Sequence, residues 1–284
     1  MTSKLAIARL SKSFGALEAL RGINLDVARG EFISVVGPSG CGKTTFLRIV
    51  AGLEHATAGE VLLDGRAVRE PGTDRGFVFQ NDSLLPWRTV LANAIIGREV
   101  AGSIGAADRQ RTMELLKLVG LEGFEHYHPR QLSGGMRQRV NLARALAIDP
   151  EILLMDEPFS SLDAQTREIM QTELLRIWEE GRKTVLFVTH QIDEAVFLSD
   201  RVLVFARRPG RVQAEVTIPL PRPRTLDMKR KPEFVALVDR IWRMIEDDVR
   251  AELNSGDFGF GDQGGAAFSA LKQKINDMLF EGRH

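Results

Sequence analysis

The chain has 284 residues, 44% hydrophobic and 27% charged, a composition typical of a globular protein with a substantial core. Its 38 basic and 38 acidic side chains cancel to a net charge of zero, which argues against nucleic-acid binding, because proteins that neutralise backbone phosphates are normally basic. No apolar run approaches the roughly 18 residues that span a bilayer, no signal pattern opens the chain, and one cysteine excludes a disulfide framework, so we expect an intracellular soluble protein.

Short strands are predicted in the first third of the chain. Every second residue is apolar at 23–27, at 61–63 and at 77–79, a period of two that suits half-buried antiparallel strands. The segment EFISVVGPSGCGKTTFLRIVAGL changes from an apolar strand through a glycine-rich loop into a helix. The expected buried face of that helix is Phe46, Leu47, Val50 and Leu53.

The middle of the chain predicts a helical insert followed by buried strands. Residues from about 88 to 147 have mainly helical patterns. The runs at 152–155 and 185–188 are apolar without alternation, which is typical of parallel strands buried on both faces. A helix at about 164–180 supplies the right-handed crossover between them. We therefore expect an α/β core with an antiparallel β portion and a helical insert.

The composition changes between residues 206 and 231. This segment holds eight basic residues, two acidic residues and four prolines, which predicts an extended, linker-like backbone. Helical patterns follow at 233–253 and 266–280, separated by a glycine-rich stretch. The first pattern has an apolar stripe whose spacing predicts docking onto the main domain: Phe234, Val238, Ile241, Ile245 and Val249.

GPSGCGKT, at residues 37–44, has the pattern of a phosphate-binding loop between a strand and a helix. Its glycines let backbone N–H groups turn toward phosphate oxygens, and the positive end of the following helix faces the same anion. Lys43 can reach the β- and γ-phosphates, and the Thr44 hydroxyl can ligate magnesium. We interpret Cys41 as a small filler in this loop. The predicted nucleotide contacts here are Gly37, Pro38, Ser39, Gly40, Cys41, Gly42, Lys43, Thr44 and Thr45.

Five further features narrow the class of enzyme. LSGGMRQR at 132–139 opens a helix, ILLMDE at 152–157 is a buried strand that ends in two carboxylates, and SLD follows at 161–163. Gln80 and His190 each end a predicted strand. The carboxylates and the imidazole thus lie at the carboxyl ends of strands, where open α/β sheets bind their ligands.

These motifs, in this order, resemble those of the nucleotide-binding subunits of ATP-binding-cassette (ABC) transporters over residues 4–225. The resemblance implies an α/β P-loop NTPase fold with a RecA-like parallel sheet core, an antiparallel β subdomain, an α-helical signature subdomain at about 88–147 and a C-terminal helical tail. It implies an ABC ATPase domain at 1–225, a helical extension at 226–284, and ATP and Mg²⁺ as cofactors of a hydrolysis reaction coupled to transport.

The resemblance also implies a role for each matching residue. Asp156 corresponds to the aspartate that holds Mg²⁺, and Glu157 to the general base that polarises the attacking water. Gln80 corresponds to a residue that contacts magnesium or water and relays to the membrane partner, and His190 to one that contacts the γ-phosphate. Phe14 corresponds to the aromatic residue that stacks on adenine, where many relatives have tyrosine.

The signature segment implies a second subunit. In this family Ser133, Gly134 and Gly135 cap the γ-phosphate bound by a facing subunit, and Asp163 lies in the segment that crosses between the two sites. One chain carries one copy of each motif, so a head-to-tail homodimer is the simplest complete assembly.

Each feature alone has a plainer explanation. An Asp–Glu pair is commonly solvated surface, a histidine at a strand end is commonly structural, Phe14 alone suits a core, and LSGGMRQR suits a glycine turn before a helix. Their joint order favours the ABC interpretation, because independent coincidences would have to multiply.

The segment SLLPWRTVLANA after Gln80, and PLPRPR at 219–224, resemble the importer branch that handles nitrate, sulfonates or taurine. The resemblance implies two separate permease subunits, a periplasmic solute-binding protein and a peripheral position on the cytoplasmic face of the inner (plasma) membrane. Residues 84–87 are expected to be exposed, and residues 84–88 to form part of the permease contact. The alternative is ordinary packing between the core and the helical insert.

Three other kinds of ABC protein remain as alternatives. DNA-repair members usually have long insertions between the phosphate loop and the signature, whereas here Lys43 and Ser133 are 90 residues apart. Translation factors usually carry two cassettes in one chain, and only one is present. Exporters often fuse the cassette to membrane helices.

Overall fold

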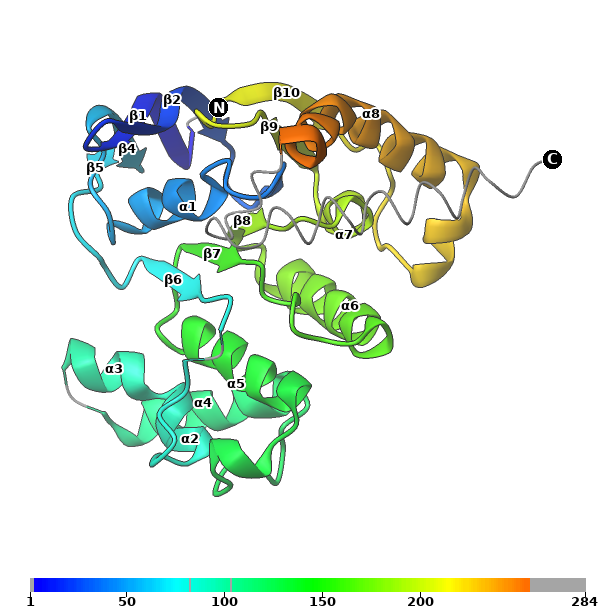
Figure 1. Ribbon diagram of the computed structural model, residues 1–284. Coiled ribbons are helices and arrows are strands. Elements are labelled where there is room, and N and C mark those ends of the chain that lie inside the picture. Colours follow the sequence, from blue (N-terminus) through cyan, green and yellow to red (C-terminus); the bar gives the residue numbers. More distant parts are fainter. Residues whose placement is uncertain (1–2, 82, 103, 256–284) are drawn as a thin grey trace.

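The computed structural model describes residues 3–255 except 82 and 103, and two sheets organise this part of the chain (Figure 1). The larger sheet has the strand order β10-β9-β3-β8-β7-β6, and the smaller antiparallel sheet has the order β2-β1-β4-β5. The smaller sheet consists of β1 (Leu5–Phe14), β2 (Leu17–Val27), β4 (Ala58–Leu63) and β5 (Arg66–Ala67).

The centre of the larger sheet is parallel and buried on both faces, as predicted from its unbroken apolar runs. β3 (Phe32–Val36), β7 (Ile152–Asp156) and β8 (Thr184–Val188) are buried at every residue, and β9 (Arg201–Phe205) at all but its first. Successive side chains of these strands belong to two different clusters, because side chains alternate across a strand. One cluster includes α1 (Lys43–Ala51) and the antiparallel sheet, and the other includes α6 (Ala164–Gly181) and α7 (Ile192–Leu198).

Two expectations about the first third of the chain are wrong. β6 (Arg75–Val78) pairs parallel with β7, with Phe77 opposite Leu154, and belongs to the larger sheet instead of an antiparallel one. In this edge strand Val78 is buried and Phe77 is partly buried, and the spacing of apolar residues does not report the direction of a strand. Leu53 is 46% exposed, because Gly52 ends α1 in a left-handed conformation before the helical spacing reaches it.

The helical insert is confirmed and lies beyond β6 at one edge of the larger sheet (Figure 1). It contains α2 (Val90–Ala94), α3 (Ile96–Ala101), α4 (Ala106–Leu118), the 3₁₀ turn η1 (Pro129–Gln131) and α5 (Gly134–Ala147).

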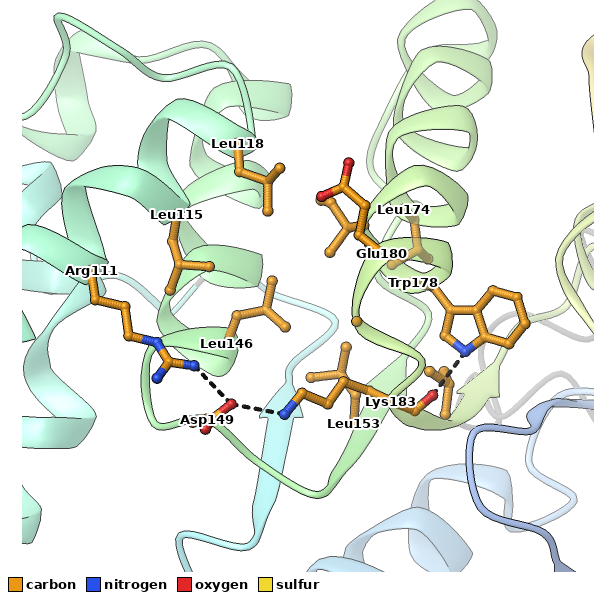
Figure 2. Close-up of a pocket in the computed structure, with 13 residues that line it drawn as sticks. Arg111, Leu115, Leu118, Leu146, Asp149, Leu153, Leu174, Trp178, Glu180 and Lys183 are labelled. Carbon is orange, nitrogen blue, oxygen red and sulfur yellow. Dashed lines mark hydrogen bonds and ion pairs between the residues drawn. The ribbon is translucent and has the colours of Figure 1, made fainter. Parts of the chain in front are cut away.

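A cleft of about 210 Å³ separates α4 and α5 from α6 and the ends of β7 and β8 (Figure 2). We call it the junction cleft. Leucines line it from both sides, and at its rim Arg111 and Lys183 both donate to Asp149 Oδ1, each at 2.8 Å. Arg176 of α6 crosses the junction to donate to the Leu118 carbonyl at 2.7 Å.

The basic, proline-rich segment is more structured than a linker. It contributes β10 (Val212–Thr217), which pairs antiparallel with β9, and the 3₁₀ turn η2 (Leu226–Arg230). Arg224 is only 5% exposed and donates to the carbonyls of Val196, Phe197 and Ser199 at the end of α7. A buried cation there satisfies carbonyls that the helix leaves without partners, so this charge is part of the core.

α8 (Pro232–Ser255) docks on α7 and β9, as its apolar stripe predicted. Phe234, Ile241 and Ile245 are each at most 5% exposed, and Val238 is partly buried. The side chain of Val249 and the helix predicted at 266–280 lie outside the described residues. Within 3–255, leaving out 82 and 103, no helix combines the length and apolarity that crossing a membrane requires.

Candidate active site

The phosphate-loop motif lies between β3 and α1, as predicted. Gly42 has a φ of 99°, and a Cβ there would lie 2.7 Å from the Leu20 side chain, so only glycine fits. A Cβ at Gly37 would lie 2.6 Å from the Phe205 carbonyl oxygen. α1 begins without a side-chain cap and without an acidic residue in its first turn. Its first backbone N–H groups can therefore serve an anion.

The loop also holds cations against its own carbonyl groups. Lys43 is 6% exposed, and its Nζ donates to the carbonyls of Gly37 at 2.7 Å and Pro38 at 2.9 Å. Arg208, from the turn between β9 and β10, donates to the Gly40 carbonyl at 3.0 Å. The charge of these side chains and the glycine cradle fit a polyphosphate. The sequence does not predict this contact of Arg208, because the basic, proline-rich composition of its segment indicates a linker.

A hydroxyl and a carboxylate meet beside the loop. Thr44 Oγ1 donates to Asp156 Oδ1 at 3.0 Å, and Asp156 is 4% exposed. Burial raises the pKa of the Asp156 carboxyl, and the neighbouring charge of Glu157 raises it further. In the described part of the chain no group of three or more His, Cys, Asp or Glu side chains could hold a metal. The hydroxyl oxygen of Thr44 and the carboxylate of Asp156 fit Mg²⁺, which usually takes one or two protein oxygens and completes its shell with water and phosphates.

Three predicted residues converge from the ends of three neighbouring strands. Glu157 Oε2 accepts from Gln80 Nε2 at 3.3 Å and lies 3.1 Å from His190 Nδ1. Gln80 follows β6, Glu157 follows β7 and His190 follows β8. The Glu157 backbone is left-handed, with a φ of 45°, and its N–H donates to the Val188 carbonyl of β8 at 2.9 Å. The alignment of these strand ends therefore places one carboxylate between an amide and an imidazole.

Phe14, at the end of β1, is 47% exposed, so it is not the core residue of the plainer interpretation. Lys12 Nζ lies 4.6 Å from the centroid of its ring. The exposed ring is therefore available for stacking on a base.

The signature segment and the SLD segment cap adjacent helices. Ser133 caps α5 by accepting from the Met136 N–H, and Asp163 caps α6 by accepting from the Thr166 N–H at 3.0 Å. The Thr166 hydroxyl also donates to Asp163, at 2.6 Å, and this hydrogen bond, followed by the one from the Thr166 N–H, lowers the pKa of Asp163. A Cβ at Gly135 would lie 2.8 Å from the Thr166 side chain, so the two helix starts lie side by side. Among the described residues, none of these groups hydrogen-bonds to the loop at 37–44 of the same chain.

The segment expected to contact a permease is only partly exposed. Leu84 is 9% exposed and belongs to the core cluster, so the expectation of exposure is wrong for this residue. Leu85 is partly buried, whereas Pro86 is exposed and Trp87 is 72% exposed.

The fold and this site together define a phosphate-loop nucleotide hydrolase. Residues 20–160 match the ABC transporter family. An uncharacterized ABC transporter ATP-binding protein of Methanocaldococcus jannaschii is 52% identical over 257 residues, which cover 89% of this chain and 95% of that protein. The chain therefore belongs to the ATP-binding proteins of ABC transporters, which hydrolyse ATP to drive transport.

Import proteins are among the relatives. The nitrate import ATP-binding protein NrtD of Synechocystis is 45% identical, covering 81% of this chain and 89% of that protein. The taurine import ATP-binding protein TauB of Rhizobium johnstonii is 46% identical, covering 83% and 92%. The resemblance to the importer branch is thereby confirmed.

A solved structure confirms the fold. MJ0796, described as a bacterial ABC transporter cassette in a dimeric structure, has a TM-score of 0.68 and 35% identity and covers 76% of this chain and 100% of its own. A second dimeric structure of the same cassette, in a post-hydrolysis state with ADP and Pi bound, has a TM-score of 0.67.

Proposed function

We propose that this chain is the ATP-hydrolysing subunit of an importer for a small anionic solute. The observation that carries the catalytic part is the convergence of Gln80, Glu157 and His190 beside the Thr44–Asp156 pair. Relatives that import nitrate, taurine and aliphatic sulfonates support the solute class. The proposed assembly is a homodimer on the cytoplasmic face of the plasma membrane, with two permease subunits and a periplasmic solute-binding protein.

The loop and its lysine would bind the triphosphate. Lys43 exchanges its two carbonyl acceptors for phosphate oxygens, which are stronger acceptors because they are charged. Thr44 and Asp156 would hold Mg²⁺, which neutralises charge on the phosphates when bound. A bound cation would also favour the ionised form of Asp156, which burial disfavours.

Glu157 is the proposed general base. Its carboxylate oxygen accepts the proton of the attacking water, while Gln80 and His190, both in contact with that oxygen, fix its direction. The phosphates would lie at the start of α1, and Glu157 directly follows the strand that ends at Asp156. The charge that develops on the γ-phosphate is stabilised by Lys43 and the backbone N–H groups of the loop.

The homodimer is proposed because one chain leaves the signature without a phosphate partner. Ser133 caps α5, and Gly134 and Gly135 are its first residues, whose backbone N–H groups have no acceptor within the helix and suit the γ-phosphate held by a second copy. Asp163 lies beside them through the Gly135–Thr166 contact and would take part in the same interface.

Glu157→Gln tests the catalytic proposal. Glutamine keeps the shape and the hydrogen bond but accepts no proton, so we expect ATP binding to persist while hydrolysis slows by roughly 10²–10⁴. Sedimentation of this variant with ATP should show a trapped dimer. The control is Glu60→Gln, an exposed carboxylate of β4. Hydrolysis at the normal rate, or a monomer with and without ATP, would contradict the base or the dimer respectively.

Comparing Lys43→Ala with His190→Ala distinguishes the loss of ATP binding from the loss of ATP hydrolysis. Removal of the buried cation should abolish or severely weaken ATP binding, measured by titration with a fluorescent nucleotide. His190→Ala should bind ATP and hydrolyse it more slowly, at a residual rate that can still be measured by phosphate release. Normal hydrolysis by Lys43→Ala would overturn the phosphate-loop assignment.

Trp87 is the proposed centre of the permease contact, since it is the most exposed aromatic side chain of its segment. Trp87→Glu should abolish solute uptake by the whole transporter and leave the basal hydrolysis of the isolated subunit unchanged. Trp242→Glu is the control, because Trp242 lies on α8 and is 45% exposed. Loss of basal hydrolysis in Trp87→Glu would show that this segment belongs to the fold of the site instead.

A further inference from the structure

A chain of buried polar side chains connects η2 to the residue before His190. Its members are Lys229 of η2, Gln171 of α6, Glu194 of α7 and Thr189, which follows β8. Gln171, Glu194 and Thr189 are each at most 2% exposed, and the Lys229 side chain is 14% exposed. Buried polar groups of this kind are costly unless they are paired, so their mutual hydrogen bonds fix their geometry.

In this series of buried side chains, the donor and acceptor of each hydrogen bond determine which atom the next residue can offer. Lys229 can only donate, and its Nζ donates to Gln171 Oε1 at 2.9 Å. The amide of Gln171 must therefore turn its Nε2 toward Glu194 Oε1, to which it donates at 3.0 Å. The other oxygen of Glu194 accepts from the Thr189 hydroxyl. Burial raises the pKa of Glu194, and these two hydrogen bonds oppose that shift.

The series of hydrogen-bonded side chains reaches the residues on both sides of His190, which are Thr189 and Gln191. The Thr189 hydroxyl accepts from the Gln191 backbone N–H at 3.0 Å, so it bridges over His190. The Thr189 backbone N–H donates to the Val35 carbonyl at 3.2 Å, close to the phosphate loop. Gln191 is also held by Arg167, whose Nη1 donates to its side-chain oxygen at 3.0 Å. The backbone around the imidazole therefore has fixed partners before and after it.

Lys229 is the outermost member and the cationic one. Its Nζ also lies 3.5 Å from a Glu168 oxygen, 3.7 Å from an Asp193 oxygen and 5.0 Å from the Phe197 ring centroid. Without the lysine, Gln171 would lose the partner that orients its amide. The flipped amide would then point an oxygen at the Glu194 carboxylate, which is repulsive.

We propose that Lys229 is a positioning residue for ATP hydrolysis: it orients Gln171, which acts through Glu194 and Thr189 to hold the His190 loop. The C-terminal extension would thereby contribute to the chemistry, although it carries none of the nucleotide motifs. The proposal rests on the proposed role of His190 and adds a residue outside the 1–225 boundary.

The test compares Lys229→Met with Lys231→Met in the full-length chain. Lys231 is an exposed lysine two residues further on. We expect kcat for ATP hydrolysis to fall about tenfold in Lys229→Met, with the ATP affinity and the Tm near their wild-type values, because misplacement of a catalytic group slows the chemical step. Lys231→Met should keep the wild-type kcat. Lys229→Arg, which keeps a cationic donor, should recover most of the rate.

The His190→Ala background separates this proposal from the proposed function. If Lys229 acts through His190, Lys229→Met should add no further loss to His190→Ala. A full additional loss in that background, or a kcat unchanged in Lys229→Met, would overturn the positioning role while His190 keeps its own. Unchanged hydrolysis in His190→Ala alone would overturn the role of His190.

Gln171→Met provides a second variant in case Lys229→Met does not fold. It removes the amide but keeps a side chain of similar length, and it should reproduce the loss of kcat. A wild-type kcat in folded Gln171→Met would contradict the proposal, because the lysine would then have no route to His190.

Discussion

The core meets the helical insert and the C-terminal extension through two very different junctions. The junction cleft is partly open, and its rim is joined by ion pairs that centre on Asp149, whose side chain is 42% exposed. α8 and η2 instead pack on α7 with nearly complete burial of Phe234 and Ile241 and with a buried polar chain. The first junction can therefore change its geometry at small cost, whereas the second behaves as part of the core.

The largest effect is expected from Ile241→Ala. Ile241 is fully buried between α8 and the core, so its truncation should lower the free energy of unfolding by about 2–5 kcal/mol. Urea unfolding followed by circular dichroism measures the change. Val235→Ala, on a side chain of the same helix that is 54% exposed, should change the free energy of unfolding by less than about 0.5 kcal/mol. Similar values for both variants would mean that α8 is not docked.

Leu118→Ala makes the matching change at the junction cleft. Leu118 is only partly buried and already faces the cleft, so the loss should be about 1 kcal/mol, from less apolar area and no new enclosed cavity. The same urea titration applies. A loss as large as that of Ile241→Ala would show that the junction is packed as tightly as the core.

Asp149→Asn removes the charge that joins Arg111 and Lys183. The hydrogen bond from Lys183, and then its charge, hold the pKa of Asp149 below its usual 3.8. The ion pairs therefore stabilise the fold above that value, and their contribution is lost as the pH falls through the lower pKa of the folded state. Because solvent screens this rim, we expect a loss of roughly 0.2–1 kcal/mol at pH 7 that shrinks progressively as the pH falls below 3.8. A difference that persists unchanged in acid would contradict this account.

The smallest effect is expected from ending the chain at Ser255. The buried contacts of α8 lie in its first half, at Phe234, Ile241 and Ile245, so this chain should fold, bind ATP and hydrolyse it at close to the full-length rate. Nucleotide titration and phosphate release measure both properties. A chain that ends before Leu226 loses η2 and α8 and is the destabilised comparison. Loss of ATP binding on ending at Ser255 would show that the boundary of the ATPase is wrong.

Sequence patterns were sufficient to predict the elements whose structure depends on a short run of neighbouring residues. The unbroken runs of β7 and β8 required burial on both faces, and the positions of Glu157 and His190 at strand ends follow from that parallel pairing. The spacing of Phe77 and Phe79 predicted the strand β6 but contained no information on its direction. The spacing that included Leu53 continued past the point where Gly52 ends the helix.

Buried cations were the main feature that the sequence did not predict. The basic, proline-rich composition of 206–231 suggested solvent exposure, yet Arg224 is bonded to carbonyls 25–28 residues away, and Lys229 to an amide 58 residues away. Only the folded arrangement of α6, α7 and η2 brings these partners together. A charge pattern in the sequence therefore identified the segment but not its place in the core.

The thiol of Cys41 gives the phosphate loop a built-in reporter. It is the chain's single cysteine, it has no exposed surface, and burial raises its pKa, so at neutral pH it is a shielded and unreactive thiol. An alkylating reagent can reach it only while the loop is open. The rate at which Cys41 is alkylated therefore measures how often the loop opens. Mass spectrometry can follow this rate in the unaltered protein, and bound nucleotide should lower it.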